Sequence, residues 1–194
     1  MGLVGLGVVY TLGNALYFTA LRDVQLSEID LLLRSSSLWT LLGGVLFLSE
    51  PLGWQGALGA FLILVSLTVL AEKPRRLVFR RSQLLALGAA LSFGAGNVFD
   101  KALSPYFDPL SYTALNLLLT GLGMVLVARQ PSRASLQAGL WQGGAWLVAA
   151  TFALTQLLLI LAFQARGGAG EVILVAQVRV VLLGIAGLWL LIPN

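Results

Sequence analysis

The stretch "DLLLRSSSLWTLLGGVLFLSE", Asp30–Glu50, decides the fold class, because it is long and apolar enough to cross a membrane as one helix. Between its terminal acidic residues it carries a single charge, Arg34. An arginine near the centre of a membrane helix costs about 2.5–3.5 kcal/mol on the insertion scale, so it is a candidate functional residue by default. The stretch therefore predicts both a membrane span and a residue whose role needs an explanation.

The composition of the whole chain agrees with this prediction. Its 194 residues are 58% hydrophobic and 10% charged, whereas a soluble domain carries about 25% charged residues. The formal charge of +4 does not indicate nucleic-acid binding, because the basic residues lie in short loops between apolar segments. The sequence has no cysteine and no histidine, so we expect no disulfide, no metal site and no cofactor.

Seven segments are predicted to span the membrane. They are separated by short segments that are polar or rich in glycine and proline. We therefore expect an all-α integral membrane protein with about seven transmembrane helices, at 3–21, 28–49, 54–71, 83–103, 110–128, 140–165 and 171–192.

An internal repeat relates two of these segments. "YTLGNALYFTA" (Tyr10–Ala20) aligns with "FALTQLLLILA" (Phe152–Ala162), which places Asn14 over Gln156. The two segments lie five helices apart, so they should cross the membrane in opposite directions. Inverted repeats are a common plan of secondary transporters, with the substrate site at the repeat interface. The repeat predicts a ten-helix protein of two inverted five-helix halves, of which this chain would be a fragment holding the third to ninth helices.

Short motifs carry a resemblance to a known family. Residues 15–70 resemble the third to fifth helices of an EamA domain, with Ser49-Glu50 where the family has a Gly-Glu turn and Gly59-Ala60 matching its Gly-Ala pair. "LLALGAALSFGAGNVFDKALSPYFDP" (84–109) resembles the start of the second such domain. The chain is thus similar to the EamA-type branch of the drug/metabolite transporter superfamily.

The resemblance implies a domain organisation. Residues 1–73 would be the C-terminal part of the first repeat with three helices, 74–82 a basic loop between the repeats, and 83–194 the second repeat with four helices and its fifth missing. The family often has a proline in the fourth and ninth helices, where this sequence has Ser37 and Val180.

The orientation is predicted from the loops. One set of loops holds most of the basic residues, and the positive-inside rule places it in the cytoplasm. The family's usual topology would place loop 72–82 outside, and for this chain we favour the charges. We expect a multi-pass protein of the bacterial inner (plasma) membrane. The basic set is Arg22, Lys73, Arg75, Arg76, Arg80, Arg81, Arg129 and Arg133.

Candidate substrate-binding residues lie on helical stripes, because residues three and four apart share a face. In the family the helices that correspond to 3–21, 28–49, 140–165 and 171–192 line the central cavity. The alternative for the amides is ordinary packing between helices. The candidates are Tyr10, Asn14, Tyr17, Arg34, Ser37, Gln156, Gln177 and Arg179.

The two arginines differ in depth. Arg34 lies about 9 Å along the helix from Glu28, so it can reach the interface, and Asp30 one turn earlier can pair with it. Arg179 lies about 12 Å from Glu171 and has no carboxylate three or four residues away. For Arg34, a structural role and a functional role are therefore equally supported. For Arg179, we favour a functional role.

Other polar residues of the predicted helices are expected to have structural roles or are left open. Thr113, Asn116 and Thr120 are expected to pack between helices, and Asn97 is open between packing and cavity. Asp100 and Lys101 are expected to form a local or interfacial pair. If transport is coupled to protons, the nearby titratable carboxylates are Glu28, Asp30, Asp100 and Glu171.

The leading functional hypothesis is a secondary transporter, an exporter or exchanger of small polar metabolites by alternating access. A cavity that contains an arginine would favour a substrate with a carboxylate or phosphate. The alternative is a structural membrane subunit or a truncated, inactive fragment. An enzyme is not expected, because the sequence clusters no acid, base or metal ligands. The expected partners are the lipid bilayer and a small-molecule substrate, with no nucleic acid, and the oligomeric state stays open.

Overall fold

A computed structural model describes residues 2–22, 29, 32–70, 81–128, 143–165 and 168–175. These residues form helices and turns, with no strand among them. A 3-10 turn, Ser104–Tyr106, extends α5, and a further helix occupies 169–175. The labelled helices are α1 (Gly2–Ala20), α3 (Ser36–Leu48), α4 (Trp54–Leu70), α5 (Arg81–Leu103), α6 (Pro109–Val127) and α8 (Gly143–Gln164).

The predicted class, an all-α membrane protein, is confirmed. Four helices in the described part of the chain are long and apolar enough to cross a membrane: α1, α5 with its 3-10 extension, α6 and α8. The predicted number of seven spans is not established, because α3 is short and the spans predicted at 28–49 and 171–192 lie partly outside the described residues.

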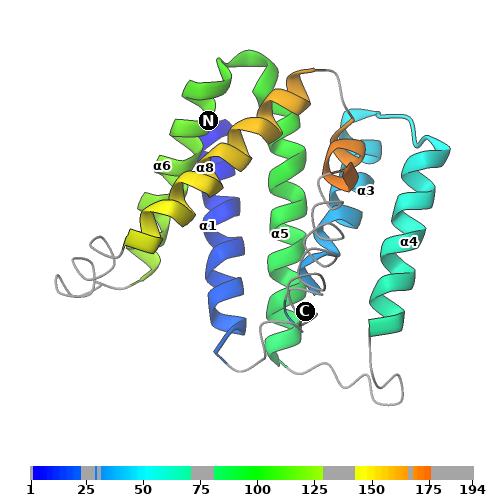
Figure 1. Ribbon diagram of the computed structural model, residues 1–194, viewed down its shortest axis with the longest axis horizontal. Coiled ribbons are helices and arrows are strands. Elements are labelled where there is room, and N and C mark those ends of the chain that lie inside the picture. Colours follow the sequence, from blue (N-terminus) through cyan, green and yellow to red (C-terminus); the bar gives the residue numbers. More distant parts are fainter. Residues whose placement is uncertain are drawn as a thin grey trace, which may run out of the picture.

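Helix α5 lies in the middle of the bundle, with α1, α6 and α8 on one side of it and α3 and α4 on the other (Figure 1). Helix α1 packs against α5 and α6, and α3 packs against α5. Helices α1 and α8 run in opposite directions (Figure 1), which is the relation that the internal repeat predicts for them.

Two glycines of α5 allow its neighbours to approach closely. A Cβ atom on Gly94 would lie 2.5 Å from the Cβ atom of Trp39 and 2.9 Å from the carbonyl oxygen of Ser36. A Cβ atom on Gly96 would lie 2.7 Å from the ring of Tyr10. Small residues commonly bring membrane helices together in this way, so α3 and α1 are both held tightly against α5.

The predicted continuous helix 28–49 is wrong at Arg34 and Ser35, where the chain makes a turn before α3 begins at Ser36. The amide of Leu38 donates to the carbonyl of Ser35, three residues back, at 3.0 Å. The Ser35 hydroxyl donates to the carbonyl of Leu32 at 2.7 Å. Serine hydroxyls compete with the backbone for such carbonyls, and bonds over three residues tighten the chain, so the sequence "RSSS" interrupts the helix.

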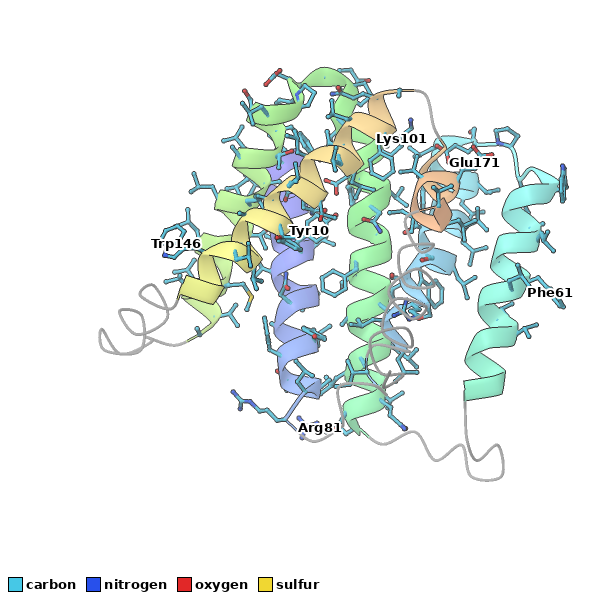
Figure 2. All side chains as sticks on the ribbon, viewed as in Figure 1. Tyr10, Phe61, Arg81, Lys101, Trp146 and Glu171 are labelled. Carbon is cyan, nitrogen blue, oxygen red and sulfur yellow. The ribbon has the colours of Figure 1, made fainter. Side chains whose placement is uncertain are left out.

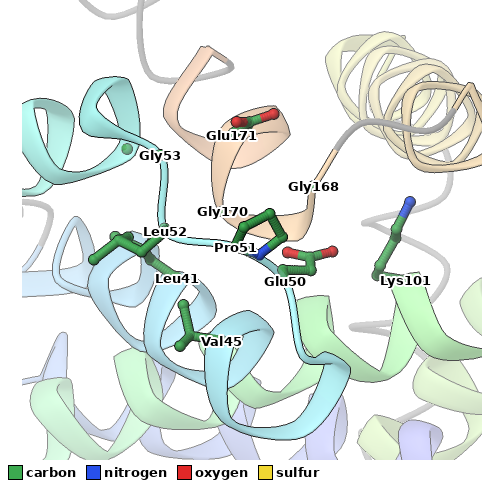
Figure 3. A pocket seen from close by; sticks show the side chains of 11 residues that line it. Leu41, Val45, Glu50, Pro51, Leu52, Gly53, Lys101, Gly168, Gly170 and Glu171 are labelled. Atoms are coloured by element: carbon green, nitrogen blue, oxygen red, sulfur yellow. The ribbon is translucent and has the colours of Figure 1, made fainter.

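Helix α3 ends at a residue in the left-handed conformation. Ser49 has φ 54°, and the amide of Glu50 donates back to the carbonyl of Gly44 at 3.1 Å. This bond satisfies a carbonyl that the helix end would otherwise leave open. The turn also directs the Glu50 side chain toward the helix at 169–175 (Figure 3).

The outer surface of the bundle is apolar. Leu126 of α6 is 81% exposed and Leu147 of α8 is 71% exposed. Trp146 and Phe61 point outward from opposite sides of the bundle (Figure 2). Exposed apolar surface of this extent is what a lipid-facing helix presents.

Candidate functional site

A cavity of about 700 Å³ lies between α1, α5, α6, α8 and the turn that precedes α3. Polar and aromatic side chains from all of these elements line it. The lining residues are Tyr10, Asn14, Tyr17, Leu33, Arg34, Ser36, Phe93, Asn97, Asn116, Leu117, Thr120, Gly121, Met124, Phe152 and Gln156.

Most of the predicted substrate-binding residues that can be placed lie together here: Tyr10, Asn14, Tyr17, Arg34 and Gln156 all line this cavity. Ser37 does not; it is fully buried, and its neighbour Ser36 lines the cavity instead. The turn at residues 34 and 35 causes this offset, because the prediction assumed one continuous helical face. Gln177 and Arg179 lie outside the described residues, as does Asp30, the predicted partner of Arg34.

The cavity lies near the middle of the bundle. Its lining residues on α1 and α6 extend from the middle of each helix toward its C-terminal end, those on α8 lie near its middle, and those on α5 lie in its C-terminal half. The C-terminal ends of α1 and α6 are on the side of the bundle where Arg81 begins α5 (Figure 2). The cavity therefore extends from the middle of the bundle toward that side.

The cavity wall combines one cation with amides and aromatic rings. Arg34 brings a guanidinium group, which can bind a carboxylate or a phosphate with two parallel hydrogen bonds. The Asn14 side chain is oriented by its own helix, since its Nδ2 donates to the carbonyl of Tyr10 at 2.8 Å. The rings of Tyr10 and Phe93 lie 6.4 Å apart between centroids. Few, well-placed polar groups in an otherwise apolar concavity are typical of sites for small molecules.

A buried carboxylate lies behind this wall. The side chain of Asp100 is fully buried, and its Oδ1 accepts a hydrogen bond from the Tyr112 hydroxyl at 2.7 Å. Its Oδ2 accepts a short hydrogen bond from the hydroxyl of Tyr10. We call this group, which joins α1, α5, α6 and α3, the Asp100 network: Asp100, Tyr10, Tyr112, Asn116, Asn97 and Thr40.

The predicted pair between Asp100 and Lys101 is wrong. Asp100 binds the two tyrosines, and the Nζ of Lys101 instead donates to the carbonyl of Phe163 on α8 at 2.5 Å. Adjacent residues of a helix are about 100° apart, so the two side chains leave α5 in different directions. The partners of Asp100 on α1 and α6 lie far from it in sequence, and local spacing therefore did not reveal them.

The packing role predicted for helix 110–128 agrees with part of the structure. Thr113 is buried and donates to the carbonyl of Pro109 at 2.8 Å, and Asn116 is buried and donates to Asp100 on α5. Asn116 and Thr120 also line the cavity, which the packing role did not include. Tyr112, Asn116 and Thr120 are spaced four residues apart, so they form one polar stripe on a membrane helix, and Tyr112 is the member that the prediction did not name.

On the opposite side of the bundle, the residue that follows the end of α3 contacts the start of the helix at 169–175. The amide of Ala169 donates to both carboxylate oxygens of Glu50, at 2.9 and 2.8 Å. We call this contact the Glu50 clasp. A second cavity, of about 420 Å³, lies beside it between α3 and the helix at 169–175, and Lys101 and Glu171 also line it (Figure 3). The clasp ties the end of α3 to the start of a helix that follows much later in the sequence.

The fold and the cavity together define a class: a multi-pass α-helical membrane protein with a polar chamber inside its bundle. Residues 1–71, which hold α1, α3 and α4, match the EamA-like transporter family. No curated protein and no solved structure matches the chain. The family match confirms the predicted resemblance to the EamA branch of the drug/metabolite transporter superfamily, and this family suggests a membrane transporter of small molecules.

Proposed function

We propose that the chain is a secondary transporter that moves a small anionic metabolite by alternating access. The observation that carries the proposal is Arg34, which lines the polar cavity together with Asn14 and Gln156. Among the described residues that line this cavity, none is a carboxylate. Arg34 contributes a cationic side chain to this set.

The physical chemistry of this wall favours an anion. A guanidinium group stays protonated, is less strongly hydrated than an ammonium group, and matches the geometry of carboxylates and phosphates. Side-chain amides and the hydroxyl groups of Tyr17 and Ser36 supply further donors around it. Between low-dielectric walls of apolar helices these interactions are stronger than at an open surface.

Alternating access requires one end of the path to be closed while the other is open. The cavity extends from the middle of the bundle toward the side where α5 begins, and the Glu50 clasp lies on the opposite side, at the end of α3. We infer that the clasp breaks and the helix at 169–175 moves away from α3 before the substrate is released on the far side. Helices α1 and α8 are related by the internal repeat, and each would then take the place of the other in lining the cavity.

Exchange by the protein in liposomes tests the proposal. The probes are radiolabelled inorganic phosphate, succinate and glutamate as anions, with glucose and choline as neutral and cationic counterparts. We expect exchange of at least one anion and of neither counterpart. Arg34→Gln should lower that exchange about 10- to 100-fold, since a hydrogen bond to a charged group contributes about 1.5–3 kcal/mol.

The matched controls are Arg34→Lys and Arg22→Gln. Arg34→Lys keeps the charge and should retain part of the exchange. Arg22 is exposed at the end of α1, so its loss should leave exchange unchanged. Exchange of the anion at the normal rate by Arg34→Gln would contradict the role of Arg34, and transport of choline or glucose alone would contradict an anionic substrate. Movement of no probe by the intact protein would favour the structural-subunit alternative.

A further inference from the structure

The carboxylate of Asp100 is buried in a membrane bundle without a cationic partner among its hydrogen-bonding neighbours. The groups that bind it in the described part of the chain are neutral: the hydroxyls of Tyr10 and Tyr112 and, at 3.4 Å, the amide of Asn116. An isolated charge that is fully buried in protein is expensive unless it is paired and hydrogen-bonded. Its surroundings therefore suggest more than a packing role.

These neighbours suit the ionised form of Asp100. An ionised carboxylate only accepts hydrogen bonds, and both of its oxygens face donors from α1 and α6. The same groups can also serve a protonated carboxyl. A hydroxyl group both donates and accepts, so Tyr10 can turn its proton toward Asn97 Oδ1, which lies 3.4 Å from it.

Asn116 provides an independent sign of a second protonation state. Asn116 is 6% exposed, and its Oδ1 atom is buried and has no hydrogen-bond partner in the described structure. A half-turn of the amide would bring Oδ1 opposite Asp100 Oδ1, where Nδ2 now lies. Two acceptor oxygens can share a hydrogen bond only if one of them carries a proton. In the state in which Asp100 is protonated, Asn116 Oδ1 can therefore accept from the carboxyl group, and Nδ2 takes the position that Oδ1 now occupies.

The carboxylate is one hydrogen bond away from the cavity. Tyr10, Asn97 and Asn116 belong both to the cavity wall and to the Asp100 network. A proton from water in the cavity can reach Asp100 by way of the Tyr10 hydroxyl, without crossing apolar packing. A change in the charge of Asp100 would in turn alter the orientation of groups that face the substrate.

Few other charged or titratable groups face Asp100. Tyr10 of α1 and Tyr112 of α6 contact it directly. The described lengths of α3 and α8 contain no acidic, basic or tyrosine side chain. Lys101 is held by the Phe163 carbonyl, and Arg34 lines the cavity beyond the wall.

We propose that Asp100 is the proton-binding residue that couples transport to a proton gradient; the coupling rests on the proposed function. In the step we infer, a hydronium ion in the cavity gives its proton to the Asp100 carboxylate and becomes water, and the proton comes to rest on Oδ1, the oxygen that faces Asn116. The site changes from one negative charge to neutral, the Asn116 amide turns so that its Oδ1 accepts from the carboxyl group, and the Tyr10 hydroxyl remains on Oδ2. When the bundle opens to the other side, the proton returns to water there.

Infrared difference spectroscopy of the purified protein during a pH titration tests the proton site without any substrate. A carboxyl group that gains a proton acquires a C=O stretching band that the ionised form lacks. We expect such a band in the wild type, its loss in Asp100→Asn, and its retention in Asp108→Asn. Asp108 is an exposed carboxylate just before α6, which makes it a matched control.

If Asp100→Asn does not fold, Tyr112→Phe still tests the proposal. It removes one donor to the carboxyl group while keeping its size and the cavity wall, since Tyr112 is not a lining residue. We expect the band to persist at a shifted frequency, because the C=O stretch of a carboxyl group responds to the loss of a hydrogen bond. A band unchanged in both variants, or no band in the wild type across the pH range in which it stays folded, would overturn the proposal.

Transport measurements test the coupling separately. The probe is whichever of phosphate, succinate and glutamate the wild type exchanges, offered to liposomes with an imposed pH gradient. Asp100→Asn should lose accumulation driven by the gradient, down to the level of protein-free vesicles, yet keep exchange without a gradient. Normal accumulation by Asp100→Asn would refute the coupling. If no probe moves, the proposed function fails while the infrared result still decides the proton site.

Discussion

The two halves of this bundle use the same helices in opposite ways. In the open half, which extends from the middle of the bundle toward the side where α5 begins, α1, α5, α6 and α8 hold polar side chains around a cavity of about 700 Å³. In the closed half, polar groups of α1, α5 and α6 bind one another in the Asp100 network, and Phe163, Tyr112 and Leu6 pack into a closed core. The polar groups of the open half face the cavity, those of the closed half face other protein groups, and Tyr10, Asn97 and Asn116 belong to both.

This contrast explains how a chain with only 10% charged residues can enclose a polar cavity. Polar groups at membrane depth need partners, and the closed half supplies them from other helices. The open half leaves some of them to a solute. If the open half is the transport site, damage there should alter transport, and damage to the closed half should first reduce stability.

Removing the centre of the closed half should have the largest effect on stability. Asp100→Ala leaves the buried hydroxyls of Tyr10 and Tyr112 without their acceptor. We expect a loss of about 3 kcal/mol in unfolding free energy, because each unsatisfied buried group costs about 1–3 kcal/mol. Thermal unfolding in detergent measures this loss. A loss no larger than that caused by Asp108→Ala, at an exposed position, would show that the Asp100 network does not stabilise the fold.

The close approach of α3 to α5 predicts the next effect. Gly94→Ala places a methyl group against Trp39 and the backbone of Ser36, and we expect a cost of about 1–3 kcal/mol from overpacking. Gly121→Ala is the matched control, because no atom lies within 4 Å of its added methyl group. Both changes gain the same helix propensity, so the difference between their unfolding temperatures isolates the packing. Equal temperatures would show that α3 does not press on α5.

The Glu50 clasp should give a smaller effect. Glu50→Gln removes the negative charge from the start of the helix at 169–175, where an anion contributes up to about 1 kcal/mol. We expect a modest fall in unfolding temperature that becomes smaller as salt is added, because salt screens the interaction. A fall that does not respond to salt would mean that the charge is not the source of the stabilisation.

The smallest expected change is a gain. Ser49 adopts φ 54° at the end of α3, a conformation that glycine adopts without steric cost. Ser49→Gly should stabilise the protein by about 0.5–1 kcal/mol and restore the Gly-Glu turn of the family. A lower unfolding temperature would show that the Ser49 side chain makes a contribution that its conformation does not suggest.

Much of the fold could be predicted from the sequence, because apolar length is enough to locate membrane helices. The predicted segments 3–21, 83–103 and 110–128 end within two residues of α1, α5 and α6. The stripe Tyr10, Asn14 and Tyr17 was also placed correctly on one cavity-facing surface. Helical spacing carries this information within one helix.

The features that the prediction missed depend on contacts between helices or on local competition. Asp100 meets Tyr10 and Tyr112 only after the helices pack, and spacing along α5 cannot reveal this. The turn at Arg34 depends on the Ser35 hydroxyl competing for the carbonyl of Leu32, which hydrophobic length does not report. Whether the cavity residues bind a substrate stays a prediction.

The central claim is that an aqueous cavity lies inside the membrane bundle, and thiol labelling tests it most directly. The chain has no cysteine, so a single introduced thiol reports on one position. Gln156 lines the cavity, whereas Leu154 on the same helix is 56% exposed on the apolar outside. In liposomes a charged, water-soluble thiol reagent should modify Gln156→Cys and leave Leu154→Cys unmodified, since lipid excludes the reagent. Modification of Leu154→Cys with protection of Gln156→Cys would contradict the cavity.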